Sequence, residues 1–127
     1  MNLPSIESKI LDYFSLYPKF HSIYLFGSVL TDNMHSDSDI DIAISKSIRL
    51  SLEERLFFIS ELESLLEKPV DLIDLCGLEG LLLGEILYHG KALKFDMDYY
   101  LSKMRGYHHY MDTYYYPHLL PSRKERI

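Results

Sequence analysis

The feature that most constrains the fold of this chain is a glycine–serine pair followed, after ten residues, by two aspartates one residue apart. The segment His21–Phe26 is rich in β-branched and aromatic side chains and predicts a strand that ends at Gly27. Glycine at that point permits a positive φ and lets the backbone come close to a ligand. Alternation along Asp39–Ile44 predicts a second strand, with Asp39 and Asp41 on one face and the isoleucines on the other.

The paired aspartates indicate metal-dependent chemistry. Two carboxylates held side by side repel each other unless a cation lies between them. Mg²⁺ prefers oxygen ligands of this kind, and a substrate phosphate usually completes its coordination. The residues therefore predict a metal-dependent phosphate site. The alternative is that Asp37, Asp39 and Asp41 form a solvated acidic loop or a structural calcium site.

The compound pattern of Gly27-Ser28, the gap and Asp39-Ile40-Asp41 resembles the signature of the polymerase-β-like nucleotidyltransferases. Because the chain is short and suits a single domain, it is similar to the minimal nucleotidyltransferases (MNT) of this superfamily. Many of these are antitoxins paired with HEPN-domain toxins. This resemblance implies that Asp39 and Asp41 bind Mg²⁺ and that Gly27 and Ser28 hold the triphosphate of ATP. It also implies a polymerase-β-like fold over residues 1–96, followed by a C-terminal helix and tail, 97–127, that pack on this domain or on a partner.

The same family uses a third carboxylate on a neighbouring strand, as a metal ligand or as a general base. The segment Val70–Leu75 offers Asp71 and Asp74, which are three residues apart and must face opposite sides of a strand. Asp71 matches the family position better and is the favoured candidate. Many relatives also carry an arginine soon after the Gly-Ser turn. This chain does not, and Lys46 or Arg49 is the expected substitute.

Strands that alternate with helices predict an α/β (α+β) fold, a small mixed sheet with helices packed on one face. Expected helices cover residues 4–17, 29–32, 51–67, 78–89 and 97–116, and expected strands cover 23–26, 39–44, 70–75 and 91–95. The helix after Ser51 is expected to bury one stripe of apolar residues, namely Leu52, Leu56, Ile59, Leu62 and Leu66. Pro117 is expected to end the last helix.

Composition narrows the class of protein. A chain of 127 residues suits one domain, and its formal charge of −6 argues against general nucleic-acid binding, which needs lysines and arginines. No apolar run approaches the ~20 residues that cross a bilayer, and no signal peptide is expected. The single cysteine, Cys76, suits a reducing compartment, so we expect a cytoplasmic protein.

The end of the chain is unusually rich in tyrosine, with seven of the eleven tyrosines between Tyr99 and Tyr116. Five tyrosine and methionine residues follow a spacing that places them on one face of a helix: Tyr100, Met104, Tyr107, Met111 and Tyr114. Such side chains bury apolar area and keep a polar tip, which favours a partner-docking surface. The resemblance suggests a HEPN toxin as that partner. The alternative is a helix that covers the core of its own domain.

The resemblance implies one leading function and leaves two others. The first is Mg²⁺-dependent transfer of AMP from ATP to a hydroxyl, expected to be a tyrosine of the HEPN toxin, so that the chain acts as an antitoxin. The second is an antitoxin that blocks its partner by contact alone. The third is nucleotidyl transfer to a small molecule, for which the short chain supplies little acceptor pocket.

Overall fold

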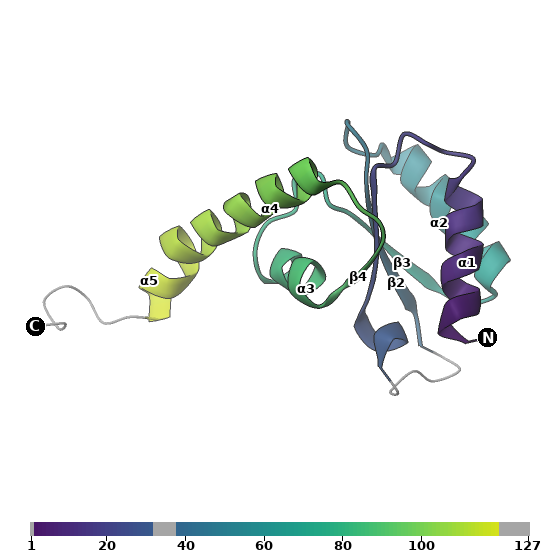
Figure 1. Ribbon diagram of the computed structural model, residues 1–127, viewed down its shortest axis with the longest axis horizontal. Coiled ribbons are helices and arrows are strands. Elements are labelled where there is room, and N and C mark those ends of the chain that lie inside the picture. The colour runs from purple at the N-terminus through teal and green to yellow at the C-terminus, as the bar shows by residue number, and fades with distance from the viewer. Residues whose placement is uncertain (1, 32–37, 120–127) are drawn as a thin grey trace, which may run out of the picture.

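Within residues 2–31 and 38–119, which the computed structural model describes, the chain forms one four-stranded mixed sheet (Figure 1). The strands are β1 (Ser22–Phe26), β2 (Ile40–Ser45), β3 (Val70–Asp74) and β4 (Lys91–Lys94). Their order across the sheet is β3-β2-β1-β4; β1 runs antiparallel to β2 and β4, and β2 runs parallel to β3. The expected α/β class and mixed sheet are confirmed.

The helices lie close to their expected positions. They are α1 (Leu3–Phe14), the 3₁₀ helix η1 (Gly27–Leu30), α2 (Leu52–Leu66), α3 (Leu81–His89), α4 (Met97–Tyr110), the π-helical turn η2 (Met111–Tyr115) and α5 (Tyr116–Leu119). The expectation that Pro117 ends the last helix is wrong. Pro117 lies in α5, and the helical run passes from the π-helical turn η2 directly into α5 through Tyr116, whose N–H donates to the carbonyl oxygen of Met111.

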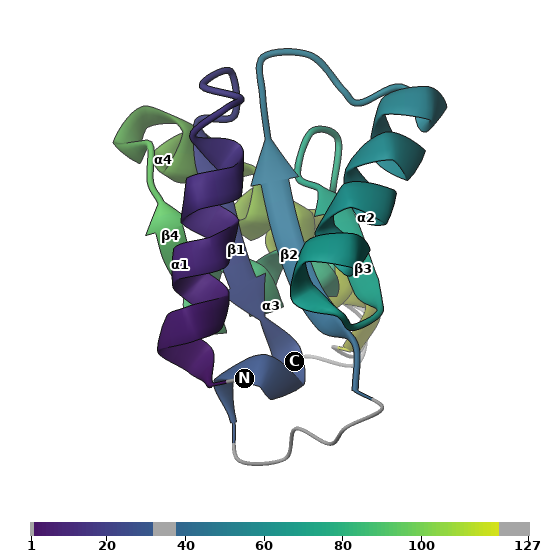
Figure 2. The ribbon, with the colours of Figure 1, turned by 90° about the vertical axis from the view of Figure 1, so that its right-hand side faces the viewer.

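Helices cover both faces of the sheet, which corrects the expectation of one covered face. Figure 2 shows α1 and α2 in front of the strands and α3 behind them. Strand residues alternate accordingly, because Ile23, Leu25 and Ile42 belong to the α1/α2 core whereas Tyr24 and Phe26 belong to the α3/α4 core. The sheet is therefore the middle layer of three.

The α1/α2 core is aromatic and fully apolar at its centre. Phe58 of α2 packs between Tyr17 and Phe20, with ring centroids 5.0 and 5.2 Å away. The expected apolar stripe of α2 is wrong in its first two turns, since Leu52 and Leu56 are 71% and 58% exposed. Its later members Leu62 and Leu66 are buried as expected, and Phe58, outside the expected stripe, is buried with them. The helix is rotated so that the phenylalanine enters the aromatic cluster.

The α3/α4 core uses most of the tyrosine-rich stripe. Four of its five members turn toward the domain itself: Tyr100, Met104 and Tyr107 pack against the core, and Met111 is 5% exposed. Only Tyr114 is largely outside, at 62% exposure. The structure thus favours the core-covering interpretation over docking of a partner through this stripe. In the described part of the chain, no helix is long and apolar enough to cross a membrane.

Candidate functional site

The carboxylates of the sequence motif meet at one end of the sheet, on the α3/α4 face. Asp41 and Asp71 are each the second residue of their strands, and the parallel register of β2 and β3 places them opposite each other. Across the other edge of β2, Asp41 pairs with Phe26, the last residue of β1. Strand register therefore brings Asp41, Asp71 and the start of the Gly27 turn to one place, from segments far apart in the sequence.

Gly27 makes room for the Asp41 side chain. Its φ is +76°, in the region that L side chains rarely adopt, and it begins η1 directly after β1. A Cβ atom at this position would collide with Oδ2 of Asp41. The glycine thus serves two purposes, because it permits the turn and leaves the carboxylate its space. The sequence had predicted only the turn and the approach of a ligand.

Ser28 follows in the first turn of η1 and is half-buried. Phe26 precedes this turn in extended conformation, and no side chain caps it. The first N–H groups of a helical turn have no acceptor within it. Gly27 and Ser28 therefore offer backbone donors next to the carboxylates.

Both of the other carboxylates contribute to the electrostatic environment of Asp41. The pKa of Asp41 is raised, first by burial of its side chain and then by the negative charges of Asp71 and Asp39. Like charges and burial both disfavour the ionised form. A cation at this point would relieve the repulsion, so the site is electrostatically suited to one.

The donor set fits a metal ion that also takes ligands from its substrate. Asp39 and Asp71 are exposed, and no three acidic, histidine or cysteine side chains of the described residues close around a point by themselves. Mg²⁺ commonly binds to one or two carboxylates and completes its shell with substrate phosphates and water. An open arrangement of Asp39, Asp41 and Asp71 beside a donor-rich turn fits that pattern.

The other sequence candidates lie elsewhere. Asp74 is on the α1/α2 side of β3, where its two oxygens accept hydrogen bonds from the N–H groups of Leu50 and Cys76, at 2.7 and 2.9 Å. The expected phosphate clamp from Lys46 or Arg49 is wrong, because both residues follow the far end of β2, at least roughly 16 Å of extended chain from Asp41. Lys46 is instead paired with Glu54 at 2.7 Å. Asp37 lies outside the described residues.

The sequence interpretation missed Arg55 and the cavity that it lines. Arg49, Arg55 and Asp74 all belong to the lining of this cavity, near the end of β3. Asp74 ends β3, two residues before Cys76, and an aspartate at such a position often bonds to its own turn, so this hydrogen bond could have been predicted from the sequence. The approach of Arg55, which comes from α2, has no local signal.

A sequence profile described as "Polymerase beta, Nucleotidyltransferase" matches residues 8–98. Protein adenylyltransferase MntA of Shewanella oneidensis is 38% identical over 76 residues, which are 60% of this chain and 55% of that protein. The matched segment thus spans little more than half of that relative.

Solved structures of toxin–antitoxin complexes contain similar chains. One, a toxin–antitoxin with AMP-PNP, matches with a TM-score of 0.74 and 32% identity over 84% of this chain and 90% of that one. Another is a tri-AMPylated Shewanella oneidensis HEPN toxin in complex with MNT antitoxin, with a TM-score of 0.68 and 29% identity over 86% of this chain and 89% of that one.

Proposed function

Because the chain belongs to the polymerase beta nucleotidyltransferase family, we propose that it transfers AMP from ATP to a tyrosine hydroxyl of a HEPN toxin and thereby acts as an antitoxin. One observation carries the proposal: the strand register gathers Asp41 and Asp71 beside Gly27, with Asp39 near enough to act on the charge of Asp41. The relatives support the substrate and the partner, since they include an adenylyltransferase and an AMPylated HEPN toxin.

Each residue has a role in this proposal. Asp39 and Asp41 hold Mg²⁺, and Asp71 completes the metal shell or takes the proton of the attacking hydroxyl. Bound Mg²⁺ neutralises the charge of the triphosphate. Gly27 and Ser28 hold the phosphates through backbone N–H groups and the Ser28 hydroxyl. The acceptor oxygen forms a bond to the α-phosphorus of ATP, and pyrophosphate leaves with the electrons of the broken P–O bond.

The reaction depends on position and charge, and the sheet supplies both. Phosphoryl-type transfer is accelerated mainly by alignment of the reacting groups and by neutralisation of charge. Asp41 and Asp71 stand on paired strands of a packed sheet, so their separation is set by backbone hydrogen bonds. The lone Cys76 remains the basis on which we propose a cytoplasmic setting.

The test is incubation of the protein with α-labelled ATP, Mg²⁺ and the HEPN protein encoded beside it, followed by intact mass measurement. We expect one or more AMP units on the HEPN protein. The double variant Asp39→Asn, Asp41→Asn should transfer none while it retains the fold, as judged by circular dichroism. Transfer by the double variant at the original rate would refute the assigned roles.

The same experiment separates the two alternative functions. A stable complex that inhibits the toxin without ATP, and equally well with the double variant, would show a contact-only antitoxin. AMP on an added small hydroxyl compound and none on the HEPN protein would show a small-molecule transferase. The exposed positions of Asp39 and Asp71 favour a protein acceptor, because these side chains are open to solvent within the described part of the chain.

A further inference from the structure

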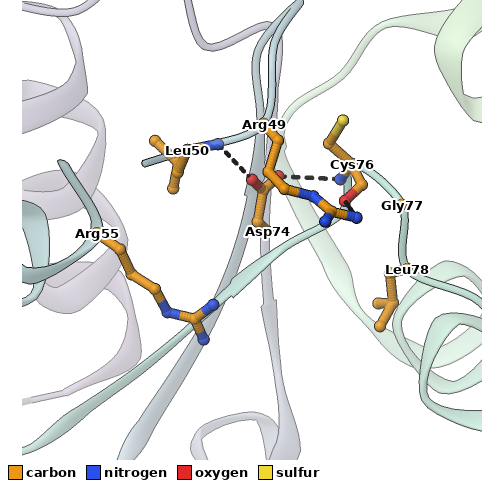
Figure 3. A pocket seen from close by; sticks show the side chains of 7 residues that line it. All are labelled: Arg49, Leu50, Arg55, Asp74, Cys76, Gly77 and Leu78. Carbon is orange, nitrogen blue, oxygen red and sulfur yellow. Dashed lines mark hydrogen bonds between the residues drawn. The ribbon is translucent and has the colours of Figure 1, made fainter. Parts of the chain in front are cut away.

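A cavity of about 250 Å³ lies at the opposite end of the sheet from the three carboxylates (Figure 3). It is bounded by the loop that leads from β2 into α2 and by the loop that leads from β3 into α3. Its lining consists of Arg49, Leu50, Arg55, Asp74, Cys76, Gly77 and Leu78. None of the residues assigned to AMP transfer belongs to this lining.

Two arginines supply the charge of the cavity. Nη2 of Arg49 donates to the carbonyl oxygen of Cys76 at 3.4 Å, and Nη2 of Arg55 donates to that of Leu72 at 2.6 Å. Neither arginine takes part in an ion pair with the residues that the structure describes, where the two ion pairs involve lysines. A guanidinium has five N–H donors, so both retain donors for a ligand.

The carboxylate in the lining is already engaged. Figure 3 shows Asp74 between the two loops, with its oxygens directed to the N–H groups of Leu50 and Cys76. These hydrogen bonds hold the two loops in place relative to each other. Two positive charges against one negative leave the cavity positive, in a chain whose formal charge is −6.

Gly77 fixes the position of Arg49. Its φ is +80°, and the space that a Cβ atom would fill is taken by the Arg49 guanidinium. The guanidinium therefore packs directly on the backbone of the β3–α3 loop. A side chain at position 77 would therefore displace the Arg49 guanidinium from this place.

We propose that this cavity binds a phosphate group through Arg49 and Arg55. Guanidinium groups match the oxygens of a phosphate with paired N–H donors, and the net positive charge of the cavity favours an anion. The phosphate can be free in solution or part of a nucleotide, and both present the same oxygens. The site is separate from the one that holds ATP for transfer.

Calorimetric titration of the purified protein with inorganic phosphate tests the proposal. EDTA is present to remove divalent metal ions. Without a metal ion, the carboxylates of the other site repel phosphate and do not contribute to the binding signal. We expect saturable binding at one site, weakened about tenfold or more in Arg49→Gln and in Arg55→Gln, since each removes a charged hydrogen-bond donor. Arg105→Gln, an equal change of charge on exposed α4 outside the cavity, should bind as the unaltered protein does.

Further variants separate loss of the site from loss of the fold. Arg49→Lys and Arg55→Lys keep the charge but lose the paired donors, so we expect intermediate affinity. Asp39→Asn with Asp41→Asn should leave phosphate affinity unchanged. Absence of saturation in the unaltered protein, or equal affinity in Arg49→Gln, Arg55→Gln and Arg105→Gln, would overturn the proposal.

Titration with AMP and with pyrophosphate identifies the source of the phosphate. Tighter binding of AMP than of inorganic phosphate, lost in Arg49→Gln, would assign the cavity to a nucleotide. Equal or weaker binding of AMP, with the same dependence on Arg49, would assign it to a free anion. Either result supports a phosphate site, and binding of AMP that ignores both arginines contradicts it.

Discussion

The two faces of the sheet carry different physical chemistry, although they share the same strands. The α1/α2 face is closed by interlocking rings and aliphatic side chains, and Lys46 and Glu54 form an ion pair at its rim. The α3/α4 face carries tyrosines over part of its area and, at one end, the carboxylate of Asp41 with the negative charges of Asp39 and Asp71 beside it. The α1/α2 face contributes apolar packing alone at its centre, whereas the α3/α4 face also carries a repelled carboxylate that lowers the stability of the fold.

Neighbouring residues of β2 make this contrast testable in one strand. Asp41→Asn should reduce AMP transfer by about a thousandfold or more, roughly 4 kcal/mol in the barrier. The same change should raise the free energy of unfolding at neutral pH in the absence of metal, because it removes a partly buried charge that is repelled by Asp71. Ile42→Val, on the other face, should lower the free energy of unfolding by about 1 kcal/mol and leave the rate of AMP transfer unchanged.

The pH dependence fixes the sign of the Asp41 effect. Its pKa in the folded protein is raised above the unfolded value of 3.8, so the unfolded chain releases this proton first as pH rises. Stability falls through that window and stays lower above it. The advantage of Asp41→Asn should therefore vanish below pH 3.8, as chemical unfolding at several pH values would measure. An advantage that persists there would remove the electrostatic explanation.

The second prediction concerns the centre of the closed face. Phe58→Ala should cost about 3–5 kcal/mol, because the ring is buried among Phe14, Tyr17 and Phe20 and its removal leaves a cavity. Met104→Ala, its counterpart on the other face, should cost less because that side chain is only partly buried. Urea unfolding of both variants measures the difference. Equal costs would mean that the two cores contribute alike.

Local patterns in the sequence were sufficient to predict the strands and most of the helices and to single out the paired aspartates Asp39 and Asp41. Asp39 and Asp41 were predicted to share a face because alternation along a strand needs no knowledge of its neighbours. The family and the fold followed from the same short segment together with its spacing.

Two of the errors concern which way a helix faces. In α2 two apolar stripes overlap, and the choice of Phe58 over Leu52 depends on rings contributed by α1 and the following loop. The tyrosine stripe of α4 has the spacing of a docking surface and of a core-covering face alike. Its actual role depends on α3, which lies between it and the sheet and is invisible to a pattern within α4.

The third prediction compares two glycines at this second interface. A Cβ atom at Gly84 of α3 would lie 2.5 Å from the ring of Tyr107, whereas one at Gly106 of α4 would meet nothing within 4 Å. Gly84→Ala should therefore cost about 1–3 kcal/mol by overpacking the two helices. Gly106→Ala should gain up to about 1 kcal/mol from helix propensity. Thermal unfolding distinguishes them, and equal shifts would mean that α4 does not pack on α3 as described.

The smallest effect reverses the sign found for Asp41. The pKa of Glu54 is lowered to about 2, first by the hydrogen bond from Lys46 and then by the Ser51 N–H of the helix cap. Its folded pKa lies below the unfolded value of 4.5, so its stabilising contribution is present above pH 4.5 and is lost as pH falls toward about 2. The stabilising contribution of the Lys46–Glu54 ion pair should thus be lost in acid. In the same range, protonation of Asp41 removes the repulsion at the carboxylate site.

Glu54→Gln isolates this contribution, because glutamine can still bond to the cap of α2 but carries no charge. We expect the variant to be slightly less stable than the unaltered protein at pH 7 and equally stable near pH 2. Lys46→Met should reproduce the loss at pH 7, since it removes the same ion pair from the other side. Glu54→Gln and Asp41→Asn remove pH-dependent contributions of opposite sign. The double variant should therefore show a smaller dependence of unfolding free energy on pH in the acid range. A difference between Glu54→Gln and the unaltered protein that is constant from pH 7 to pH 2 would show that the ion pair contributes nothing and that only the cap matters.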